Sequence, residues 1–369
     1  MNNSSPITNH TLQITDHGLR ITDYPRVSII ILNWNGWADT IECLESLYQI
    51  TYPNYDVIVV DNGSEDESIE KIKEYCEGKI EVESKFFEYS SENKPIKIIE
   101  YTREEAEAGG GKEKEISDLP SNRKLILIKS EKNYGFAEGN NIGMRYALKA
   151  LDPDYVLLLN NDTVVDKEFL GELVKVAEEE EKIGIAGPKI YYYDYKGRSD
   201  VINFTGANLN LRKLKENRYG CGEIDKGQLD KRMEIDKIEG SAMLLKRKVL
   251  EEAGLFDPDY FTYWEETDLC FRAARKGFKS LYAQRAKIWH KEAASTGGTL
   301  SSHYIYYITR NQFLFLKKNA TKLQLLSFLL YFFGFRFWFS GGVHLIYHRN
   351  INTFISFLRG VRDGVKMFH

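Results

Sequence analysis

Cysteine is scarce in this chain of 369 residues, which has only Cys43, Cys76, Cys221 and Cys270. The four lie far apart and no two form a CxxC pair, so we expect reduced thiols rather than a disulfide framework or a zinc site. The chain also lacks a strong charge of either sign, because its formal net charge is -4 at pH 7. That balance gives no reason to expect a nucleic-acid partner.

Several signatures of other protein classes are missing as well. The chain has no GxxxxGK[ST] phosphate-binding loop, and its glycine-rich segment is not a GxGxxG run, which speaks against P-loop and dinucleotide-binding enzymes. No Ser-His-Asp order or nucleophilic cysteine setting indicates a hydrolase. Residues 1–24 are polar without a long apolar run, so we predict an N-terminal extension, no secretory signal and a cytoplasmic location.

What the chain does have is an alternation of short apolar runs and amphipathic segments. Runs rich in apolar residues predict buried strands at residues 27–32, 55–60, 124–129, 155–159 and 183–192. Helical spacing predicts helices at residues 37–50, 66–76, 140–150 and 169–182. This alternation is typical of a doubly wound α/β sheet flanked by helices, which we place at residues 25–318.

Two stretches interrupt this order. Residues 83–122 contain the charged, glycine-rich run EEAEAGGGKEKE, for which we predict a partly flexible insertion, with an edge strand in the neighbouring KPIKIIEY. Residues 195–236 are polar with short patterns, which indicates a β-rich excursion. Beyond it we expect a strand at 238–245, helices at 248–253 and 267–276, and two terminal strands at 278–282 and 286–289.

Polar residues follow four of the predicted strands at the point where each strand ends. The segments are NWNG from Asn33, DNGS from Asp61, NYGFAEGNNIG from Asn133 and NND from Asn160. Each alone predicts a turn, because Asn and Asp bond to nearby backbone and tolerate left-handed geometry. The carboxyl ends of strands in an open α/β sheet, however, meet in the crevice that binds ligands. Four polar ends in succession therefore indicate a binding site.

The residue types at these strand ends suit a nucleotide. Asp61 could accept a hydrogen bond from a base N–H or a ribose hydroxyl. Gly135, Gly139 and Gly143 would let the backbone approach a phosphate or a sugar closely.

A second polar group lies in YFTYWEETDLCFRAARKG, residues 260–277. Acids favour the first turn of a helix, and Asp268 has Arg272 four residues on, so a structural role is sufficient for Asp268. The adjacent Glu265 and Glu266 follow an aromatic run. Aromatic surroundings can raise the pKa of a carboxyl group and make it a usable general base.

The segments VSIIILNWNG, VVDNGSED, NYGFAEGNNIG, LLLNNDT, EGSAMLLKR, GLFDPDYFTYWEETDLCFRAARKG and WHKEAASTGG, in that order, resemble the inverting family 2 glycosyltransferases of the GT-A fold, and among them the rhamnosyltransferase-like members. The resemblance covers roughly residues 26–318. It implies transfer of a sugar from a nucleoside diphosphate, with dTDP-rhamnose as one candidate donor, to a hydroxyl of a glycan or polyprenyl-linked acceptor with inversion. It also implies a role in cell-envelope polysaccharide assembly.

The resemblance assigns roles to individual residues. Glu266, with Glu265 as the competing assignment, matches the family's general base. Asp162 matches the last carboxylate of the DxD-type motif, which binds Mg²⁺ or Mn²⁺ bridged to the diphosphate, and His290 matches a histidine often near that metal. The residues expected around the sugar nucleotide are Asn33, Asn35, Asp61, Asn133, Gly135, Phe136, Gly139, Asn141, Asn160 and Asn161.

Two positions depart from the family's pattern. Asn160 stands where the first acid of the DxD-type motif is expected, so the metal has one fewer anionic ligand and its affinity should fall. Glu266 stands where Asp is usual and is one methylene longer. At His290, a purely structural histidine is the alternative.

The C-terminal residues 319–369 are predicted to form a basic, apolar helical region. From Lys317 onward the chain has eight Lys or Arg against one acid, Asp363. Residues 323–350 are heavily apolar, but Arg336 near their middle is unlike a clean transmembrane helix. We expect two amphipathic segments, broken at Gly341-Gly342, lying peripherally on the inner face of the membrane. A core helix or an oligomer contact is the alternative.

Two other functions stay open at the level of sequence. A nucleotidyltransferase shares a similar α/β base but would want a glycine-rich loop with Lys or Arg directly after the first strand, which NWNGWADT lacks. A catalytically silent protein that binds a sugar nucleotide or a carbohydrate is compatible with the departures at Asn160 and Glu266.

Overall fold

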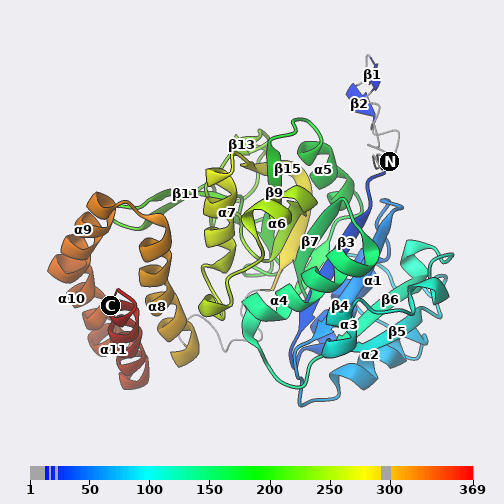
Figure 1. The fold of residues 1–369 in the computed structure, drawn as a ribbon, viewed down its shortest axis with the longest axis horizontal. Coiled ribbons are helices and arrows are strands. Elements are labelled where there is room, and N and C mark those ends of the chain that lie inside the picture. The colour runs from blue at the N-terminus through cyan, green and yellow to red at the C-terminus, as the bar shows by residue number, and fades with distance from the viewer. Residues whose placement is uncertain (1–12, 16–17, 21–23, 292–300, 369) are drawn as a thin grey trace, which may run out of the picture.

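The computed structural model describes residues 13–15, 18–20, 24–291 and 301–368 (Figure 1). Most of the predicted extension 1–24, and residues 292–298 of the segment WHKEAASTGG, lie outside the described residues. Within the extension, β1 (Gln13–Thr15) and β2 (Gly18–Arg20) form an antiparallel hairpin.

A mixed sheet forms the centre of the molecule. Its strands are β3 (Val27–Asn33), β4 (Tyr55–Asp61), β5 (Lys97–Thr102), β6 (Lys124–Lys129), β7 (Tyr155–Asn160), β8 (Thr163–Val165), β9 (Ile183–Tyr192), β10 (Ile202–Phe204), β13 (Met233–Glu234), β14 (Ala242–Lys246) and β15 (Lys279–His290). They follow the order β13-β15-β9-β14-β7-β3-β4-β6-β5, with β10 on β9 and β8 on β15. The strands from β7 to β5 are parallel, whereas β14 runs antiparallel between β7 and β9.

Helices cover both faces of this sheet (Figure 1). They are α1 (Trp37–Leu47), α2 (Ser68–Cys76), α3 (Arg103–Ala108), α4 (Gly135–Tyr146), α5 (Phe169–Ala177), α6 (Arg247–Ala253) and α7 (Glu265–Arg275). Residues of α1, α2 and α5 share one apolar cluster with Ile29 and Ile31, while residues of α4, α6 and α7 share another with Ile30. Successive residues of a strand point to opposite faces, so β3 is apolar throughout because both faces are covered. The predicted α/β sheet flanked by helices is confirmed.

Helix α4 begins at Gly135, earlier than the predicted start at Asn140. A Cβ at Gly139 would lie 2.6 Å from Cδ1 of Leu32, and a Cβ at Gly143 would lie 2.7 Å from Cγ2 of Ile30. These two glycines therefore let α4 pack closely against β3. Their open side faces the sheet, and the approach of their backbone to a phosphate stays a prediction.

The charged insertion is more regular than its composition indicates. β5 is the outermost strand beyond β6, which confirms the predicted edge strand. Residues 103–108, predicted as a loop, form α3. Its start is stabilised by a capping box, in which Glu105 N–H donates to Thr102 Oγ1 at 3.2 Å and Thr102 N–H donates to Glu105 Oε2 at 2.8 Å. Local capping thus substitutes for the apolar face that the segment lacks.

The excursion at residues 195–236 is β-rich, as predicted. It supplies β10 and β13 to the sheet and a separate hairpin of β11 (Ala207–Asn210) and β12 (Lys215–Arg218). The two terminal strands predicted after it are one strand, β15, with a register shift between Ala283 and Lys287. Short 3-10 and π turns lie at Glu113–Glu115, Ser121–Arg123, Ala147–Leu151, Pro258–Tyr260, Phe332–Arg336 and Val343–Tyr347.

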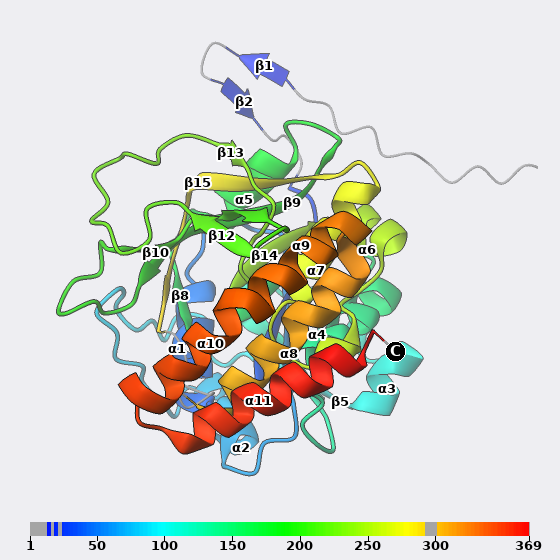
Figure 2. The ribbon, with the colours of Figure 1, turned by 90° about the vertical axis from the view of Figure 1, so that its left-hand side faces the viewer.

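Four helices form a C-terminal lobe beside the sheet domain (Figure 2). They are α8 (Ser302–Asn319), α9 (Lys322–Tyr331), α10 (Phe337–Gly342) and α11 (Ile351–Lys366). The lobe has its own apolar cluster, which includes Phe313, Phe328 and Phe332. α9 and α10 belong to one continuous helix, Lys322–Tyr347, so the predicted break at Gly341-Gly342 was wrong. Glycine costs a helix only about 1 kcal/mol per residue, which the flanking helix can absorb.

The continuous helix Lys322–Tyr347 exposes much of its apolar surface. Among the described residues it is the one helix that is long enough, with 26 residues, and apolar enough to cross a membrane. Only 11% of its most apolar 18-residue stretch is buried. Its most exposed large side chains are Leu323, Leu330, Trp338, Phe339, Ile346 and Tyr347. A core helix would be mostly buried, whereas this helix buries one side, with Phe328 and Phe332, against the lobe and leaves the rest exposed.

Candidate active site

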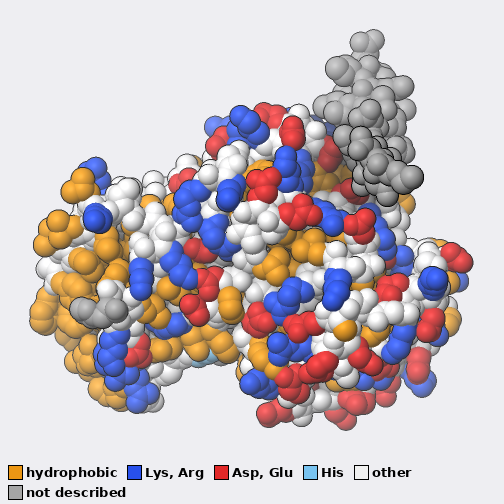
Figure 3. Space-filling view, in the orientation of Figure 1, with side chains coloured by type: hydrophobic (Ala, Val, Ile, Leu, Met, Phe, Trp, Pro, Cys, Tyr) orange, Lys and Arg blue, Asp and Glu red, His pale blue; other side chains and the backbone are white. Residues whose placement is uncertain are grey.

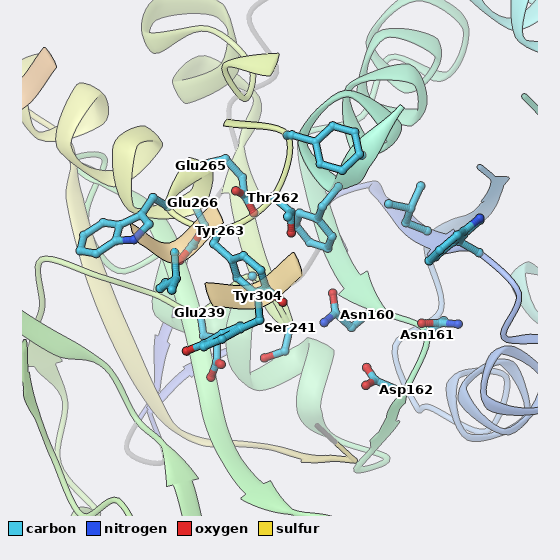
Figure 4. A pocket seen from close by; sticks show the side chains of 18 of the residues that line it. Asn160, Asn161, Asp162, Glu239, Ser241, Thr262, Tyr263, Glu265, Glu266 and Tyr304 are labelled. Carbon is cyan, nitrogen blue, oxygen red and sulfur yellow. The ribbon is translucent and has the colours of Figure 1, made fainter. Parts of the chain in front are cut away.

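A cavity of about 380 Å³ opens at the carboxyl ends of β3 and β7, next to the first turn of α7 (Figure 4). Strand ends, the start of α4 and the loop before α7 all contribute to its wall. Most of the predicted site residues line it, namely Asn133, Gly135, Phe136, Asn160, Asn161, Asp162, Glu265, Glu266 and His290. The predicted residues that do not line it are Asn33, Asn35, Asp61, Gly139 and Asn141.

Asn33 and Asp61 bind each other instead of facing the cavity. They end two adjacent parallel strands in register, and Asn33 Nδ2 donates to Asp61 Oδ2 at 2.8 Å. Ser64 donates to the same carboxylate through its hydroxyl at 2.6 Å and through its N–H at 3.0 Å. Asn35 Oδ1 likewise accepts from the Glu65 N–H at 2.7 Å. In this arrangement the three predicted nucleoside contacts hold the loops after β3 and β4.

Asn141 also forms hydrogen bonds within the protein. Its Nδ2 donates to the Phe256 carbonyl at 2.9 Å and its Oδ1 accepts from the Phe256 N–H at 3.0 Å. The side chain therefore ties α4 to the segment that leads into α7. Gly139, two residues before Asn141, faces β3, as described above.

Asn62, which was not among the predicted site residues, lines the cavity directly after β4. Its Nδ2 donates to Asn133 Oδ1 at 3.0 Å and to the Gly135 carbonyl at 3.1 Å, while its Oδ1 accepts from the Tyr134 N–H at 3.1 Å. It thereby fixes the start of α4 against the end of β4. The sequence does mark Asn62, because it follows Asp61 in the polar strand end DNGS.

Asp162 and His290 meet at one wall of the cavity. Asp162 lies in the turn from β7 to β8, and His290 ends β15, where it pairs with Thr163 of β8. This pairing places His290 Nε2 3.2 Å from Asp162 Oδ1. Burial raises the pKa of the Asp162 carboxyl, but His290, a backbone N–H and Lys291 outweigh it, so that pKa lies below its ordinary value. Asp162 is therefore a carboxylate at neutral pH.

The two asparagines before Asp162 differ in their surroundings. Asn161 Nδ2 donates to Thr40 Oγ1 at 3.1 Å and to the Gly36 carbonyl at 3.3 Å, so it holds the start of α1. The Asn160 side chain is directed into the cavity (Figure 4). Asn160 therefore stays available to a ligand, whereas Asn161 is largely occupied.

The donors at this wall fit a hard divalent cation that shares its coordination with a ligand. No group of three or more His, Cys, Asp or Glu side chains that could hold a metal occurs in the part of the chain that the structure describes. Asp162 and His290 supply an anionic oxygen and a nitrogen. Mg²⁺ commonly binds through one or two carboxylates and takes its remaining ligands from substrate phosphates and water. The pair fits that mode and does not fit a closed, all-protein metal site.

Glu265 and Glu266 form another wall, in the first turn of α7. They are 3% and 6% exposed. Burial and then the charge of Glu266 raise the pKa of the Glu265 carboxyl well above its ordinary value. The Nζ of Lys237 lies 3.7 Å from Glu266 Oε1. Lys237 therefore places a positive charge beside Glu266, whereas the raised pKa favours the protonated form of Glu265.

Lys237 was missed in the sequence. Burial lowers the pKa of its amine, but the carboxylates of Glu216 and Glu266 outweigh it, so that pKa is raised. Its Nζ lies 2.8 Å from Glu216 Oε1, on β12 of the excursion. The excursion thus reaches the acid pair. No local spacing rule relates these three positions, so the sequence carried no signal for the contact.

The loop before α7 is strained and is held by the C-terminal lobe. Phe261, Tyr263 and Trp264 have φ of 62°, 67° and 79°, the left-handed region that costs a non-glycine residue about 1–3 kcal/mol. Asn311 of α8 is fully buried, and its Nδ2 donates to three carbonyl oxygens between Tyr260 and Tyr263, at 2.7 to 2.8 Å. A residue outside the sheet domain therefore fixes the loop that positions the acid pair.

Known proteins resemble this chain in sequence and in fold. The family profile described as Glycosyltransferase like family 2 matches residues 114–305, and the profile described as Glycosyl transferase family 2 matches residues 28–96. The chain is 24% identical to the low-salt glycan biosynthesis hexosyltransferase Agl10 of Haloferax volcanii, over 68% of this chain and 79% of that protein. It is 26% identical to the dTDP-rhamnosyl transferase RfbF of Shigella flexneri, over 55% of this chain and 66% of that protein.

Among solved structures, the mannosyltransferase PcManGT from Pyrobaculum calidifontis, in complex with GDP-Man and Mn²⁺, has a similar fold. The TM-score is 0.53 and the identity 12%, over 93% of this chain and 88% of that chain. At this identity the likeness concerns the fold, and it confirms the GT-A-type architecture.

Proposed function

Because the chain belongs to glycosyltransferase family 2, we propose that it is an inverting enzyme that moves a sugar from a nucleoside diphosphate to a hydroxyl of a glycan or lipid-linked acceptor. The observation that carries the proposal is one cavity with the Asp162–His290 pair on one wall and the Glu265–Glu266 pair on another. The first pair suits a diphosphate and the second suits a hydroxyl. RfbF is named for dTDP-rhamnose, which makes that donor the first to test.

Glu266 is the proposed general base. Its carboxylate would take the proton of the acceptor hydroxyl while the hydroxyl oxygen bonds to the anomeric carbon. The bond from that carbon to the diphosphate oxygen breaks as the new bond forms, and attack from the opposite face inverts the anomeric centre. Glu265, whose pKa is raised by burial and by the neighbouring Glu266, would position Glu266 and hold a proton rather than accept one.

The diphosphate of the donor would lie against Asp162 and His290. A divalent cation bound there, Mg²⁺ or Mn²⁺, would neutralise charge on the departing diphosphate. Asn160 offers an amide oxygen in place of the carboxylate that the family pattern expects, so we propose a weaker metal affinity than two acids would provide.

The acceptor side of the proposal concerns the cell envelope. The names of Agl10 and RfbF support a role in glycan assembly, and the exposed helix Lys322–Tyr347 supports a peripheral position at the inner face of the membrane. Membership of the glycosyltransferase family speaks against the nucleotidyltransferase alternative. A silent binding protein remains as one outcome of the test.

The test is a panel of nucleoside diphosphate sugars offered to the full chain with and without Mn²⁺. We expect one donor to raise the melting temperature, since a ligand at a hundred times its Kd stabilises the fold by about 2.7 kcal/mol, and to be turned over slowly to free nucleotide. Binding without turnover in the presence of acceptor glycans would indicate a silent protein. A panel in which no donor binds would overturn the proposal.

Asp162→Ala tests the position of the cation. We expect the Mn²⁺-dependent part of donor binding to weaken by at least about tenfold, because an anionic ligand is lost. Asp118→Ala, an exposed change in the insertion, is the matched control and should leave the Mn²⁺ titration as in the unmodified chain. An unchanged titration in Asp162→Ala would remove this residue from the metal site.

A further inference from the structure

A second cavity, of about 510 Å³, lies between α8 and α11 in the C-terminal lobe. Its charged lining consists of Arg359, Arg362 and Asp363, and Ser302 and Ser356 also line it. Asp363 is already engaged by Arg362 Nε at 2.8 Å and by the Tyr306 hydroxyl at 3.3 Å. Arg359 is exposed and forms no ion pair with the described acids. The cavity therefore holds one uncompensated positive charge.

His303 connects this cavity with the candidate active site, because it lines both. Its ring centroid lies 4.8 Å from that of Tyr307, and the Tyr307 ring stacks on Phe261 at 5.0 Å. Phe261 lines the first cavity and Tyr307 the second. A molecule with an anionic group near Arg359 could thus extend along these rings toward Glu266.

An apolar stripe leads along α11 to the same cavity. Ile351, Ile355 and Leu358 are 55%, 41% and 37% exposed, and their spacing of four and three residues places them on one helix face. The next position on that face, four residues on, is Arg362, which lines the cavity. Hydrophobic side chains also gather over α9 and α10 at this end of the molecule (Figure 3). The apolar stripe of α11 thus ends at the cationic side chain of Arg362.

We propose that the cavity between α8 and α11 binds the phosphate groups of a membrane-embedded, phosphorylated lipid that carries the acceptor. This inference rests on the proposed function. Arginine pairs with phosphate through parallel hydrogen bonds, and the serine hydroxyls can add donors. The lipid chain would follow the apolar stripe of α11. The eight Lys or Arg residues against one acid from Lys317 onward would attract the lobe to an anionic bilayer.

The first test measures binding of the full chain to phosphatidylcholine vesicles that contain a long-chain isoprenyl phosphate. Vesicles of phosphatidylcholine alone, and vesicles with phosphatidylglycerol at equal charge density, are the reference arms. We expect the isoprenyl phosphate vesicles to bind several-fold more tightly than both, and Arg359→Gln to remove that difference. Arg349→Gln, an exposed change outside the cavity, should weaken binding to both anionic vesicles alike, by about fivefold at most.

Several results would overturn the proposal. Equal binding to the two anionic vesicles, or equal losses in Arg359→Gln and Arg349→Gln, would reduce the effect to general surface charge. Inorganic diphosphate that bound the chain as tightly as the vesicles would show that the lipid chain contributes nothing. Binding to neutral vesicles as tight as to all others would leave no role for phosphate.

The second test separates this inference from the proposed function. With a donor identified, we expect Arg359→Gln to raise the KM for a lipid-phosphate acceptor several-fold while donor-induced stabilisation and donor hydrolysis stay unchanged. A chain that binds isoprenyl phosphate vesicles selectively but no sugar nucleotide would retain the lipid site and contradict the glycosyl transfer. A chain that transfers sugar, but whose acceptor KM is unaltered in Arg359→Gln, would support the glycosyl transfer and contradict the lipid site.

Discussion

The sheet domain and the C-terminal lobe place the same residue types in opposite surroundings. Ile29, Ile30 and Ile31 of β3 have no exposed surface, because helices cover both faces of the sheet. In the helix Lys322–Tyr347, by contrast, Leu330 is 69% and Trp338 70% exposed. Apolar surface left in water forgoes about 25 cal/mol per Å². The sheet domain thus buries the apolar side chains of its central strand within itself, whereas the lobe leaves an apolar surface exposed that is suited to an apolar partner.

The two regions are nevertheless joined at the acid pair. Asn311 belongs to α8 of the lobe, yet it holds the strained loop that precedes Glu265 and Glu266. Changes in the sheet domain should therefore alter chemistry with a soluble donor, and changes on the exposed face of the lobe should alter contacts with a membrane. The predictions below divide along that line.

The largest expected effect is in the sheet domain, at the proposed base. Glu266→Gln should lower turnover by about 10²- to 10⁴-fold, the usual contribution of a general base, while donor binding survives. Steady-state transfer and donor-induced melting shifts measure the two quantities. Glu265→Gln is the matched comparison and should lose much less. Turnover that persists in Glu266→Gln but is lost in Glu265→Gln would exchange the two roles.

The next effect is in the lobe and should leave the chemistry untouched. Trp338→Asp should weaken binding to anionic vesicles by about tenfold or more, because burial of a large apolar side chain contributes about 1.5–3 kcal/mol. Donor-induced stabilisation should not change. Asn352→Asp adds the same charge on α11 without removing apolar surface, and should have a small effect. If Trp338→Asp bound vesicles normally, a second copy of the chain would be the occupant to test by sedimentation.

A pair of glycines compares the packing of the two regions directly. A Cβ at Gly139 would meet Leu32 at 2.6 Å, whereas a Cβ at Gly342 has no atom within 4 Å. Gly139→Ala should therefore lower the free energy of unfolding by about 1–3 kcal/mol. Gly342→Ala should raise it by up to about 1 kcal/mol, since alanine favours the helix. Denaturant unfolding measures both. Equal effects would contradict the contrast in packing.

The last prediction concerns the pH dependence that Glu265 gives the stability of the sheet domain. Burial raises its folded-state pKa, so its contribution to stability is complete below the unfolded pKa and is lost as pH rises toward the folded pKa. The loss is at most about 1.4 kcal/mol per pH unit. Glu265→Gln should thus match the unmodified chain near pH 4 and become the more stable of the two by pH 8 in melting experiments. A stability difference between the two chains that stayed constant from pH 4 to pH 8 would show that Glu265 does not titrate in this range.

Much of the fold could be predicted from the sequence. The predicted strands at 124–129 and 183–192 coincide with β6 and β9. Strands covered on both faces must be apolar without interruption, so their ends are marked in the sequence itself. The break predicted at Gly341-Gly342 failed because a glycine pair only weakens a helix, and whether the helix continues depends on its neighbours.

The candidate site could be predicted in part. Polar strand ends and the acid pair located Asp162, Glu265 and Glu266, but they also indicated Asn33 and Asp61, which bind each other. Whether a polar residue at a strand end faces a ligand or the neighbouring strand depends on the register of the two strands. Local sequence carries no mark of that.

By itself the sequence determined the helices and strands, the faces that they bury and the polar character of the strand ends, because periodicity and residue type act over a few neighbouring residues. Only the tertiary structure decided that His290 meets Asp162, that Lys237 is directed at Glu266, and that Asn311 holds the loop before them. Each of these contacts joins single polar residues far apart in the chain. Their geometry depends on how the strands and helices pack, so no local sequence pattern could predict it.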